Sequence, residues 1–396
     1  MHYLIIFLLQ NLQNQEVGIN YLRLAEKQGN PLAYAALGDL YLDGTIEKDV
    51  FKARLYYEKL AATNQSLGSQ KLGYIYFNGI GVEKDEKKAI QYYELSARLG
   101  NSEAQFFLGS LYLSNYFDHP IYSKAISYLQ YAAHNQNLDA LVKLGKICYF
   151  GVGCEINYNL AKEYFEKAAN KNNLESIYLL AKMYQNGKGT KVNLQKAIEM
   201  YGKCIEIEDD RVENFRLKEK SVIKPIRSSI YFYLSMNDLG LIHITEPFVK
   251  DLNLGFKYIK EAGLNEFVHA KNNYGLILKY YNDNPDKAQA IFEEASKKNF
   301  CLSDFNIGLL FEEKGQIDES VQFYIKASQH EDVPLMFRNH FIIDERLDIS
   351  KTFIICLANL KLVVHFLNQS KNDDARQFFI RSLSKLINFA KGTLNQ

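Results

Sequence analysis

The chain has 396 residues, and its 47 Lys and Arg residues are almost balanced by 46 Asp and Glu residues, for a formal net charge of +1. This balance supplies no long-range field for a polyanion, so we expect neither a nucleic-acid binder nor a protein held on an acidic membrane by charge. Apolar residues make up 47% and charged residues 23%, which is typical of a folded protein and excludes a disordered one.

The N-terminal stretch MHYLIIFLLQ contains an apolar run from Leu4 to Leu9. The run is much shorter than the roughly 20 residues that a membrane-spanning helix needs. It also lacks the basic region and the small-residue cleavage site of a signal peptide. We therefore expect no integral membrane segment and an intracellular, cytoplasmic protein, while the short apolar run leaves secretion open.

A short first helix is expected over residues 3–12, followed by a second helix in the stretch GINYLRLAEKQGN that starts at Gly18. On this pattern the chain begins inside a repeat. This leaves open that the chain is one segment of a longer protein.

Two ladders of small residues then run along the chain with one period. Glycines inside aromatic runs recur at intervals of 35 or 36 residues, and alanines in the following segments recur at intervals of 36. The first ladder consists of Gly38, Gly73, Gly109 and Gly145, with Ala181 in the same place, and the second of Ala53, Ala89, Ala125, Ala161 and Ala197. A period between 20 and 50 residues is the signature of a solenoid.

Each repeat reads as a helical hairpin. Leu72, Ile75 and Tyr76 lie at helical spacing, residues 78–81 interrupt the pattern, and helical spacing resumes from Ala89. A glycine inside a helix costs about 1 kcal/mol relative to alanine. Since four repeats keep it at the same register, we expect these four structural glycines to let the partner helix approach closely.

The loop between the two helices carries a Gly-x-Gly pair, as in Gly79 and Gly81. A dinucleotide-binding loop would follow a strand and carry a third glycine, where this chain has Lys84. The same pair recurs at residues 151–153 and 187–189. Repetition favours a glycine-rich turn after a helix over a phosphate-binding loop, so we expect no cofactor there.

The stretch LGYIYFNGIGVEKDEKKAIQYYELSA resembles the Sel-one-like repeat family, a relative of the tetratricopeptide repeats, with Tyr92 in place of the usual tryptophan. The resemblance covers residues 15–204. It implies an all-α fold, a right-handed α/α superhelical solenoid of stacked antiparallel helix hairpins. It also implies a non-enzymatic scaffold or adaptor that binds a protein or peptide partner and no small-molecule substrate.

The later chain departs from this pattern. We expect Sel-one-like repeats over residues 1–204 (a partial first repeat and then five units), a charged insertion over 205–232, degenerate repeats over 233–333 and two capping helices over 334–396. Second helices of the degenerate repeats are expected to begin near Leu254, Asp286 and Asp318, with Asn284 as a cap and Pro285 at the first helical position.

No catalytic, cofactor-binding or metal-binding residues are predicted. None of the eight histidines belongs to a His-Glu-x-x-His motif, and no nucleophile elbow, Walker loop or kinase catalytic loop is present. The five cysteines are expected to be buried free thiols.

Two other functions remain open. Cys148 and Cys154 lie six residues apart, and secreted relatives carry repeated cysteine pairs, so a secreted or luminal relative with hydrolase-like or inhibitor activity is one alternative. The other is the repeat region of a longer, kinase-linked regulatory protein.

In related tetratricopeptide arrays the first helix of each hairpin lines a concave groove. Carried over to this sequence, the positions one and four residues after each ladder glycine and three before it are candidates for partner binding. The candidate groove residues are Asp39, Leu42, Gln70, Tyr74, Phe77, Phe106, Lys146, Tyr149, Tyr178, Lys182 and Gln185, with Ser110 and Leu113 at equivalent places. Aromatic side chains beside charged ones suit a peptide with apolar and acidic groups. The alternative is that neighbouring repeats bury these side chains.

Overall fold

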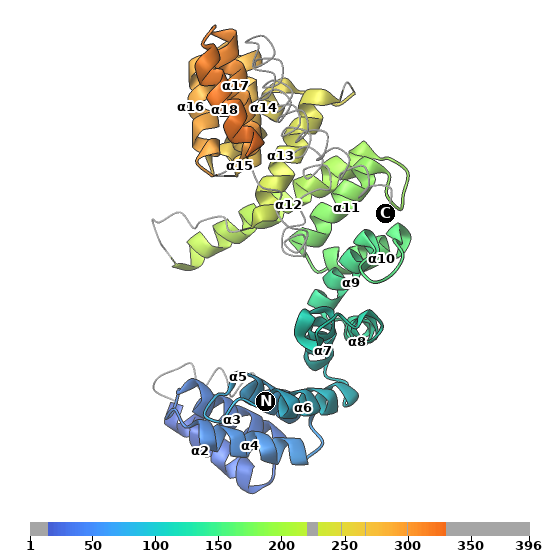
Figure 1. Cartoon of the computed structure of the whole chain (residues 1–396). Helices are drawn as coiled ribbons and strands as arrows, with labels where there is room; N and C mark the ends of the chain where they lie inside the picture. The colour runs from blue at the N-terminus through green and yellow to red at the C-terminus, as the bar shows by residue number, and fades with distance from the viewer. Residues whose placement is uncertain (1–14, 220–228, 247, 266, 299, 330–396) are drawn as a thin grey trace. The chain divides into compact units, whose positions relative to one another are not determined.

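The structure, a computed structural model, describes residues 15–219, 229–246, 248–265, 267–298 and 300–329. These residues form seventeen α-helices and one short 3-10 helix, and no strand occurs among them (Figure 1). The expected all-α solenoid of stacked antiparallel hairpins is confirmed. The expected helices at residues 3–12 and 334–396 lie outside the described residues.

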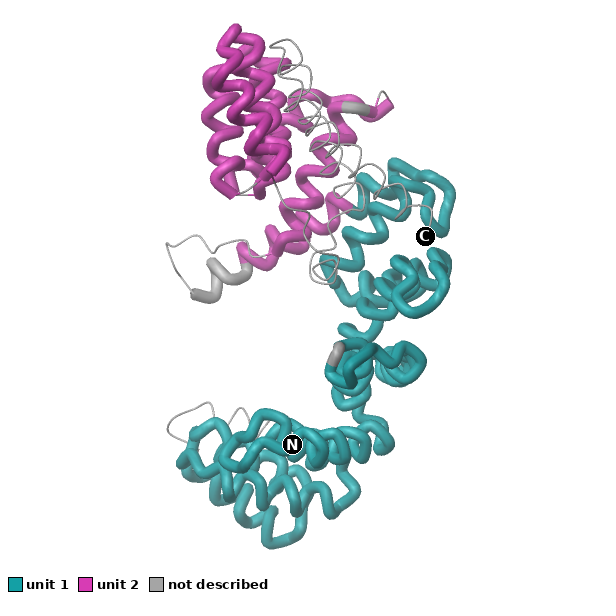
Figure 2. The backbone as a smooth tube through the Cα atoms, viewed as in Figure 1, with its two compact units in different colours: residues 1–200 teal, residues 201–396 magenta. Residues whose placement is uncertain are grey.

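Two compact units divide the chain, residues 1–200 and 201–396 (Figure 2). In the first unit the helices from α2 to α11 each pack against the next one in the chain. The bounds are α2 Gln15–Lys27, α3 Pro31–Asp43, α4 Val50–Ala62, α5 Ser66–Asn78, α6 Glu86–Arg98, α7 Ser102–Leu113, η1 Asn115–Phe117, α8 Tyr122–His134, α9 Leu138–Phe150, α10 Tyr158–Ala169 and α11 Leu174–Asn186.

The second unit continues as consecutive hairpins, with α13 to α18 again packed in chain order. Their bounds are α13 Ile230–Thr245, α14 Leu252–Leu264, α15 Val268–Tyr280, α16 Pro285–Ser296, α17 Cys301–Glu313 and α18 Ile317–Ser328. The second helices of these hairpins therefore begin within two residues of the expected positions. Asn284 caps α16 and Pro285 is its first residue.

Helix α12, Leu194–Glu219, carries the chain across the division between the two units. Residues 205–219, which open the expected charged insertion, are therefore a helical continuation of the last Sel-one-like hairpin. No proline occurs between residues 194 and 219 to end the helix. Arg211 and Glu208, one turn apart, form an ion pair with Nη2 and Oε1 at 2.7 Å, which supports the helix.

Asparagine and aspartate start most of these helices. The side chain of Asn101 accepts a hydrogen bond from the Ala104 N–H, and that of Asp85 accepts one from the Lys88 N–H. Such a cap is worth about 1 kcal/mol because it satisfies an N–H group that the helix leaves unpaired. The other caps of this kind are Asn30, Asp49, Asn137, Asn157, Asn173, Asp251 and Asn284.

The ladder glycines lie where the two helices of a hairpin come closest. A Cβ atom at Gly38 would lie 2.5 Å from the ring of Tyr57, and one at Gly145 would lie 2.4 Å from the ring of Phe165. The corresponding distances are 2.9 Å for Gly73 to Tyr93 and 2.7 Å for Gly109 to Leu129. Tyr57, Leu129 and Phe165 are fully buried, so each large side chain fills the space that a glycine leaves.

The elbow glycines have two separate roles. Gly79 ends α5 in the left-handed conformation, with φ of 66°, and its N–H bonds to the carbonyl of Ile75. Gly81 lies against the previous hairpin, since a Cβ there would be 2.7 Å from Val50 at the start of α4. The first glycine reverses the chain and the second allows the next hairpin to stack.

Candidate interaction surface

The first helices of the hairpins in the first unit, α3, α5, α7, α9 and α11, carry the candidate groove residues. We call the surface of these five helices that carries the candidate groove residues the first-helix face. Their exposure differs strongly from one repeat to the next. Tyr74 is exposed, with 46% of its surface accessible. Half-buried residues are Asp39, Leu42, Gln70, Phe77, Phe106, Lys146 and Gln185. Tyr149, Tyr178 and Lys182 are buried, with 8%, 5% and 8% accessible.

Aromatic packing connects the middle repeats of this face. The ring of Phe77 on α5 meets the ring of Phe107 on α7 edge-on, with centroids 5.1 Å apart. Phe107 also stacks on Tyr93 of α6 at 4.0 Å. Phe77 therefore contributes to the core between two hairpins, whereas Tyr74, one turn earlier on α5, leaves its ring available to a partner.

Polar contacts connect consecutive first helices. Lys71 Nζ on α5 donates to Asp39 Oδ1 on α3 at 2.7 Å, and the hydroxyl of Tyr57 donates to the same oxygen at 2.7 Å. Gln70 Nε2 donates to Glu103 Oε2 on α7 at 3.2 Å. These bonds fix the register between neighbouring repeats, and they neutralise the charges of Asp39 and Lys71 locally.

The C-terminal part of the first-helix face holds more lysines. Lys146 Nζ on α9 forms an ion pair with Glu175 Oε1 on α11 at 2.8 Å. Lys143, one turn before it, donates to Ser110 Oγ on α7 at 3.0 Å and lies over the ring of Phe106, with Nζ 5.3 Å from the centroid. Burial lowers the pKa of Lys143, and the positive charge of Lys146 lowers it further.

Lys71, Lys143 and Glu175 are not among the groove residues predicted from the sequence. The signal was present, because Lys71 and Lys143 each stand two residues before a ladder glycine, Gly73 and Gly145. The candidate positions taken from the related arrays are one and four residues after the ladder glycine and three before it, so they do not include these lysines.

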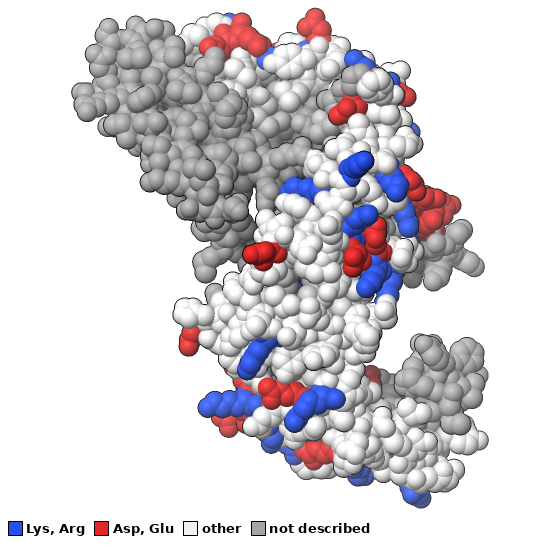
Figure 3. Space-filling view, turned by 90° about the vertical axis from the view of Figure 1, so that its right-hand side faces the viewer, with Lys and Arg blue, Asp and Glu red and all other residues white. Residues whose placement is uncertain are grey.

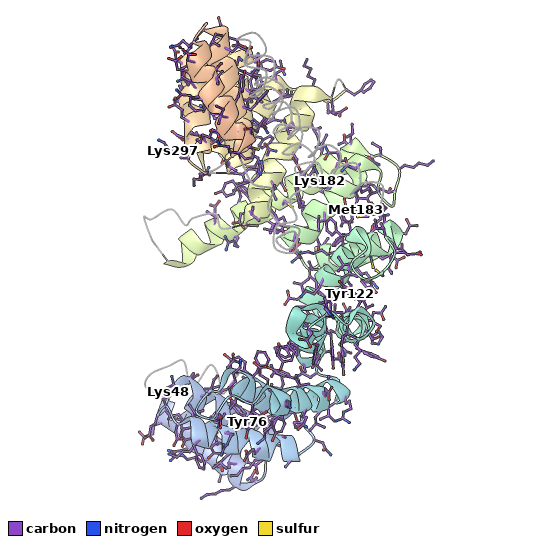
Figure 4. The ribbon with its side chains drawn as sticks, in the orientation of Figure 1. Lys48, Tyr76, Tyr122, Lys182, Met183 and Lys297 are labelled. Carbon is purple, nitrogen blue, oxygen red and sulfur yellow. The ribbon has the colours of Figure 1, made fainter. Side chains whose placement is uncertain are left out.

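A second repeated constellation lies at the elbow end of the hairpins. Tyr76, labelled in Figure 4, stacks on Tyr92 with ring centroids 5.7 Å apart and planes 10° apart. Lys88 Nζ lies 4.1 Å from the centroid of the Tyr76 ring and donates to its hydroxyl at 3.0 Å. The same lysine–tyrosine–tyrosine stack recurs with Lys52, Tyr41 and Tyr56, and with Lys124, Tyr112 and Tyr128. Each stack joins the two helices of one hairpin, which is a structural role.

A hollow of about 700 Å³ is lined by residues of three consecutive hairpins, from α4, from α5, α6 and the loop between them, and from η1. The loop between α7 and α8 has no Gly-x-Gly pair. In its place Tyr116 donates its hydroxyl hydrogen to Glu86 Oε2 at 2.6 Å. Acidic and basic side chains alternate around the hollow, which selects no charge type of ligand. Its lining residues are Arg54, Tyr76, Val82, Glu83, Lys84, Asp85, Glu86, Lys87 and Tyr116.

The cysteines offer little thiol chemistry in the described part of the chain. Cys148 takes the place of the stacked tyrosine in the fourth repeat and is buried, while Cys154 in the elbow is exposed, and both are free thiols. Burial raises the pKa of Cys148 to about 11. Partial desolvation also raises the pKa of the exposed Cys154, whose Sγ lies 3.8 Å from the carbonyl oxygen of Ile147. A thiol with a raised pKa is protonated and weakly nucleophilic near neutral pH. The expectation of buried thiols holds for Cys204 and Cys301 but not for Cys154, and Cys356 lies outside the described residues.

The described residues show no sign of a metal site or of a membrane-spanning helix. Within the described ranges, no cluster of three or more His, Cys, Asp or Glu side chains could hold a metal ion. None of the described helices is both long and apolar enough to cross a membrane. On the face shown in Figure 3, Lys and Arg lie beside Asp and Glu instead of gathering into a patch of one sign.

Comparisons with known proteins support the repeat assignment. The Sel1 repeat model matches residues 31–62, 69–101, 102–137, 138–173 and 174–204. A crystal structure of a protective antigen of uropathogenic Escherichia coli with an SLR fold is 18% identical, with a TM-score of 0.52, over 93% of this chain and 87% of that one. A Sel1 repeat protein from Oxalobacter formigenes is 22% identical, with a TM-score of 0.47, over 62% of this chain and 92% of that one.

The likeness to the protective antigen concerns the fold alone, because the identity is low. A comparison with curated proteins found no match.

Proposed function

We propose that this chain, whose residues 31–204 are Sel1 repeats, is a scaffold that binds a protein or peptide partner on the first-helix face. The repeats form a helical solenoid, which is a general fold for protein interaction. The chain would act inside the cell as an adaptor without catalysis of its own.

One observation carries this proposal. Tyr74 leaves 46% of its surface accessible on α5, in the middle of a face whose neighbouring side chains are held by inter-repeat hydrogen bonds. An exposed aromatic ring on a rigid surface contributes much binding energy at low entropic cost. The ion pair Lys71–Asp39 holds α3 and α5 in register. Lys146 pairs with one oxygen of Glu175 and keeps further ammonium donors that can bind an acidic group of a partner.

The buried residues restrict the surface that a partner can use. Tyr149, Tyr178 and Lys182 are too enclosed to give a ready contact. The proposed surface therefore consists of the accessible residues on α3, α5, α7 and α9, with Tyr74 as the aromatic anchor and Lys146 as the charged one.

The test compares two paired variants of the full chain. Tyr74→Ala with Lys146→Gln changes the first-helix face, and Tyr131→Ala with Lys167→Gln changes an exposed tyrosine and an exposed lysine on the second helices α8 and α10. Proteins captured by each variant are quantified by mass spectrometry, and circular dichroism checks the fold. We expect the first pair alone to lose its partners. Unchanged capture by a folded first pair would refute the proposal.

A further inference from the structure

Two lysines occupy the same place in different repeats. Lys71 on α5 and Lys143 on α9 each stand two residues before the ladder glycine of their helix. Each one reaches back to the residue that follows the ladder glycine in the previous repeat. Lys71 Nζ lies 2.7 Å from Asp39 Oδ1, and Lys143 Nζ lies 3.0 Å from Ser110 Oγ.

The two places differ in charge. Asp39 is a carboxylate that neutralises Lys71, whereas Ser110 is a neutral hydroxyl that leaves the charge of Lys143 uncompensated. Among the described residues no carboxylate lies within ion-pair distance of Lys143. Asp139, one turn earlier on α9, attracts Lys143 only through space, and Lys146 repels it.

An uncompensated ammonium in a half-buried position is unfavourable, because burial removes part of its hydration. Ser110 supplies one hydrogen bond and the ring of Phe106 supplies a cation–π contact, with Nζ 5.3 Å from the ring centroid. The repeat thus keeps a lysine in the geometry of a lysine–carboxylate pair, next to α7, without the carboxylate. An acidic group from outside would complete the pair.

We propose that Lys143 is the anchor for an acidic side chain of the bound polypeptide, seated beside Ser110 and Phe106 between α7 and α9. The proposal rests on the proposed function and specifies which part of the first-helix face reads the charge of the partner. The recognised group is an anionic oxygen, from a carboxylate or from a phosphorylated side chain. The uncompensated positive charge favours an acidic partner over an apolar one.

The sequence offers a direct way to fill the place from within. Ser110→Asp would give Lys143 a carboxylate partner on α7, as Asp39 on α3 is the partner of Lys71 on α5. It should stabilise the fold and exclude an acidic ligand at the same time. Ser127→Asp is the matched control, because Ser127 is an exposed serine on α8, the second helix of the same repeat.

The binding experiment uses the full chain and a fluorescein-labelled peptide of Glu and Leu residues spaced by Gly and Ser. Twin peptides carry Gln or phosphoserine in place of every Glu. We expect the Glu or the phosphoserine peptide to bind at least about tenfold more tightly than the Gln peptide, as expected for one charge-assisted contact. The tighter of the two acidic peptides identifies the source of the anionic group.

Variants decide whether Lys143 is responsible. Lys143→Met and Ser110→Asp should each bind the acidic peptide about tenfold more weakly, while Ser127→Asp binds it as the wild type does. Ser110→Asp should also melt at a higher temperature than Ser127→Asp. The inference is wrong if the wild type does not prefer an acidic peptide, or if folded Lys143→Met binds it unchanged. If the Tyr74 and Lys146 variant loses its partners while the Lys143 variants keep theirs, only this inference fails and the proposed function stands.

Discussion

Replacing Gly145 by alanine tests the packing on which the whole repeat depends. In an ordinary exposed helix this change stabilises by about 1 kcal/mol, because alanine is the better helix former. Here the new Cβ would lie 2.4 Å from Phe165 Cε1 and 2.6 Å from its Cδ1. Phe165 is fully buried, so its ring has no free space to retreat into.

The magnitude follows from these two opposing effects. Overpacking a rigid core costs about 3 kcal/mol at the upper end of the usual range. The helix propensity returns about 1 kcal/mol of this, so we expect Gly145→Ala to lower the free energy of unfolding by about 2 kcal/mol. Packing should therefore reverse the sign that local propensity predicts.

Gly202 provides the matched control. It also lies within a helix, α12, but nothing stands within 4 Å of a Cβ built there. Gly202→Ala should raise the free energy of unfolding by about 1 kcal/mol. Urea denaturation followed by circular dichroism at 222 nm measures both variants against the wild type. The packing argument is refuted if Gly145→Ala is as stabilising as Gly202→Ala.

Three further predictions concern titration and thiol exposure. Burial and, next, the hydrogen bond to Asp39 raise the pKa of Tyr57, so the folded protein keeps its proton above pH 10 while the unfolded chain loses it. The urea midpoint of unfolding should therefore fall as the pH rises above 10, and it should fall less in Tyr57→Phe. Burial lowers the pKa of His269 from 6.5 to about 4, so the folded protein keeps this side chain neutral while the unfolded chain binds a proton. The free energy of unfolding should therefore fall as the pH drops from 6.5 toward 4, and His269→Leu should reduce this loss. An equal loss in the variant would contradict the role given to His269. Cys154 is exposed and Cys148 buried, so in thiol titration of the native chain Cys154→Ser should remove one fast-reacting equivalent while Cys148→Ser leaves the fast phase unchanged.

The helices and their turns could be predicted from the sequence because each repeat contains the local signals that start, end and reverse its helices. The small residue of the Ala89 ladder recurs in every repeat, and the Gly-x-Gly pair with an Asp or Asn cap recurs in three of them, as at Gly79, Gly81 and Asp85. Each of these signals acts on residues close to it in the chain. The hairpin interpretation of the loop at residues 78–81 rested on that repetition, and the left-handed turn at Gly79 agrees with it.

The charged stretch after residue 204 carries no repeat pattern from which its local structure could be predicted. Its lack of an apolar ladder predicts an insertion and says nothing of its local structure, and residues 205–219 continue α12. The Glu208–Arg211 pair supports this extension of a helix that already has its nucleus, although no repeat pattern is present.

The sequence by itself determined the period, the hairpins and the positions where two helices touch, since these depend on neighbours close in the chain. Only the tertiary structure decided which first-helix side chains a partner can reach. Tyr74 and Tyr149 are both first-helix aromatics predicted for the groove, yet one is 46% accessible and the other 8%. The tertiary structure also decided that Lys71 forms an ion pair with a carboxylate whereas Lys143 bonds to a hydroxyl. The reason is that burial and charge compensation depend on residues about one repeat away, whose side chains meet only after the hairpins have stacked.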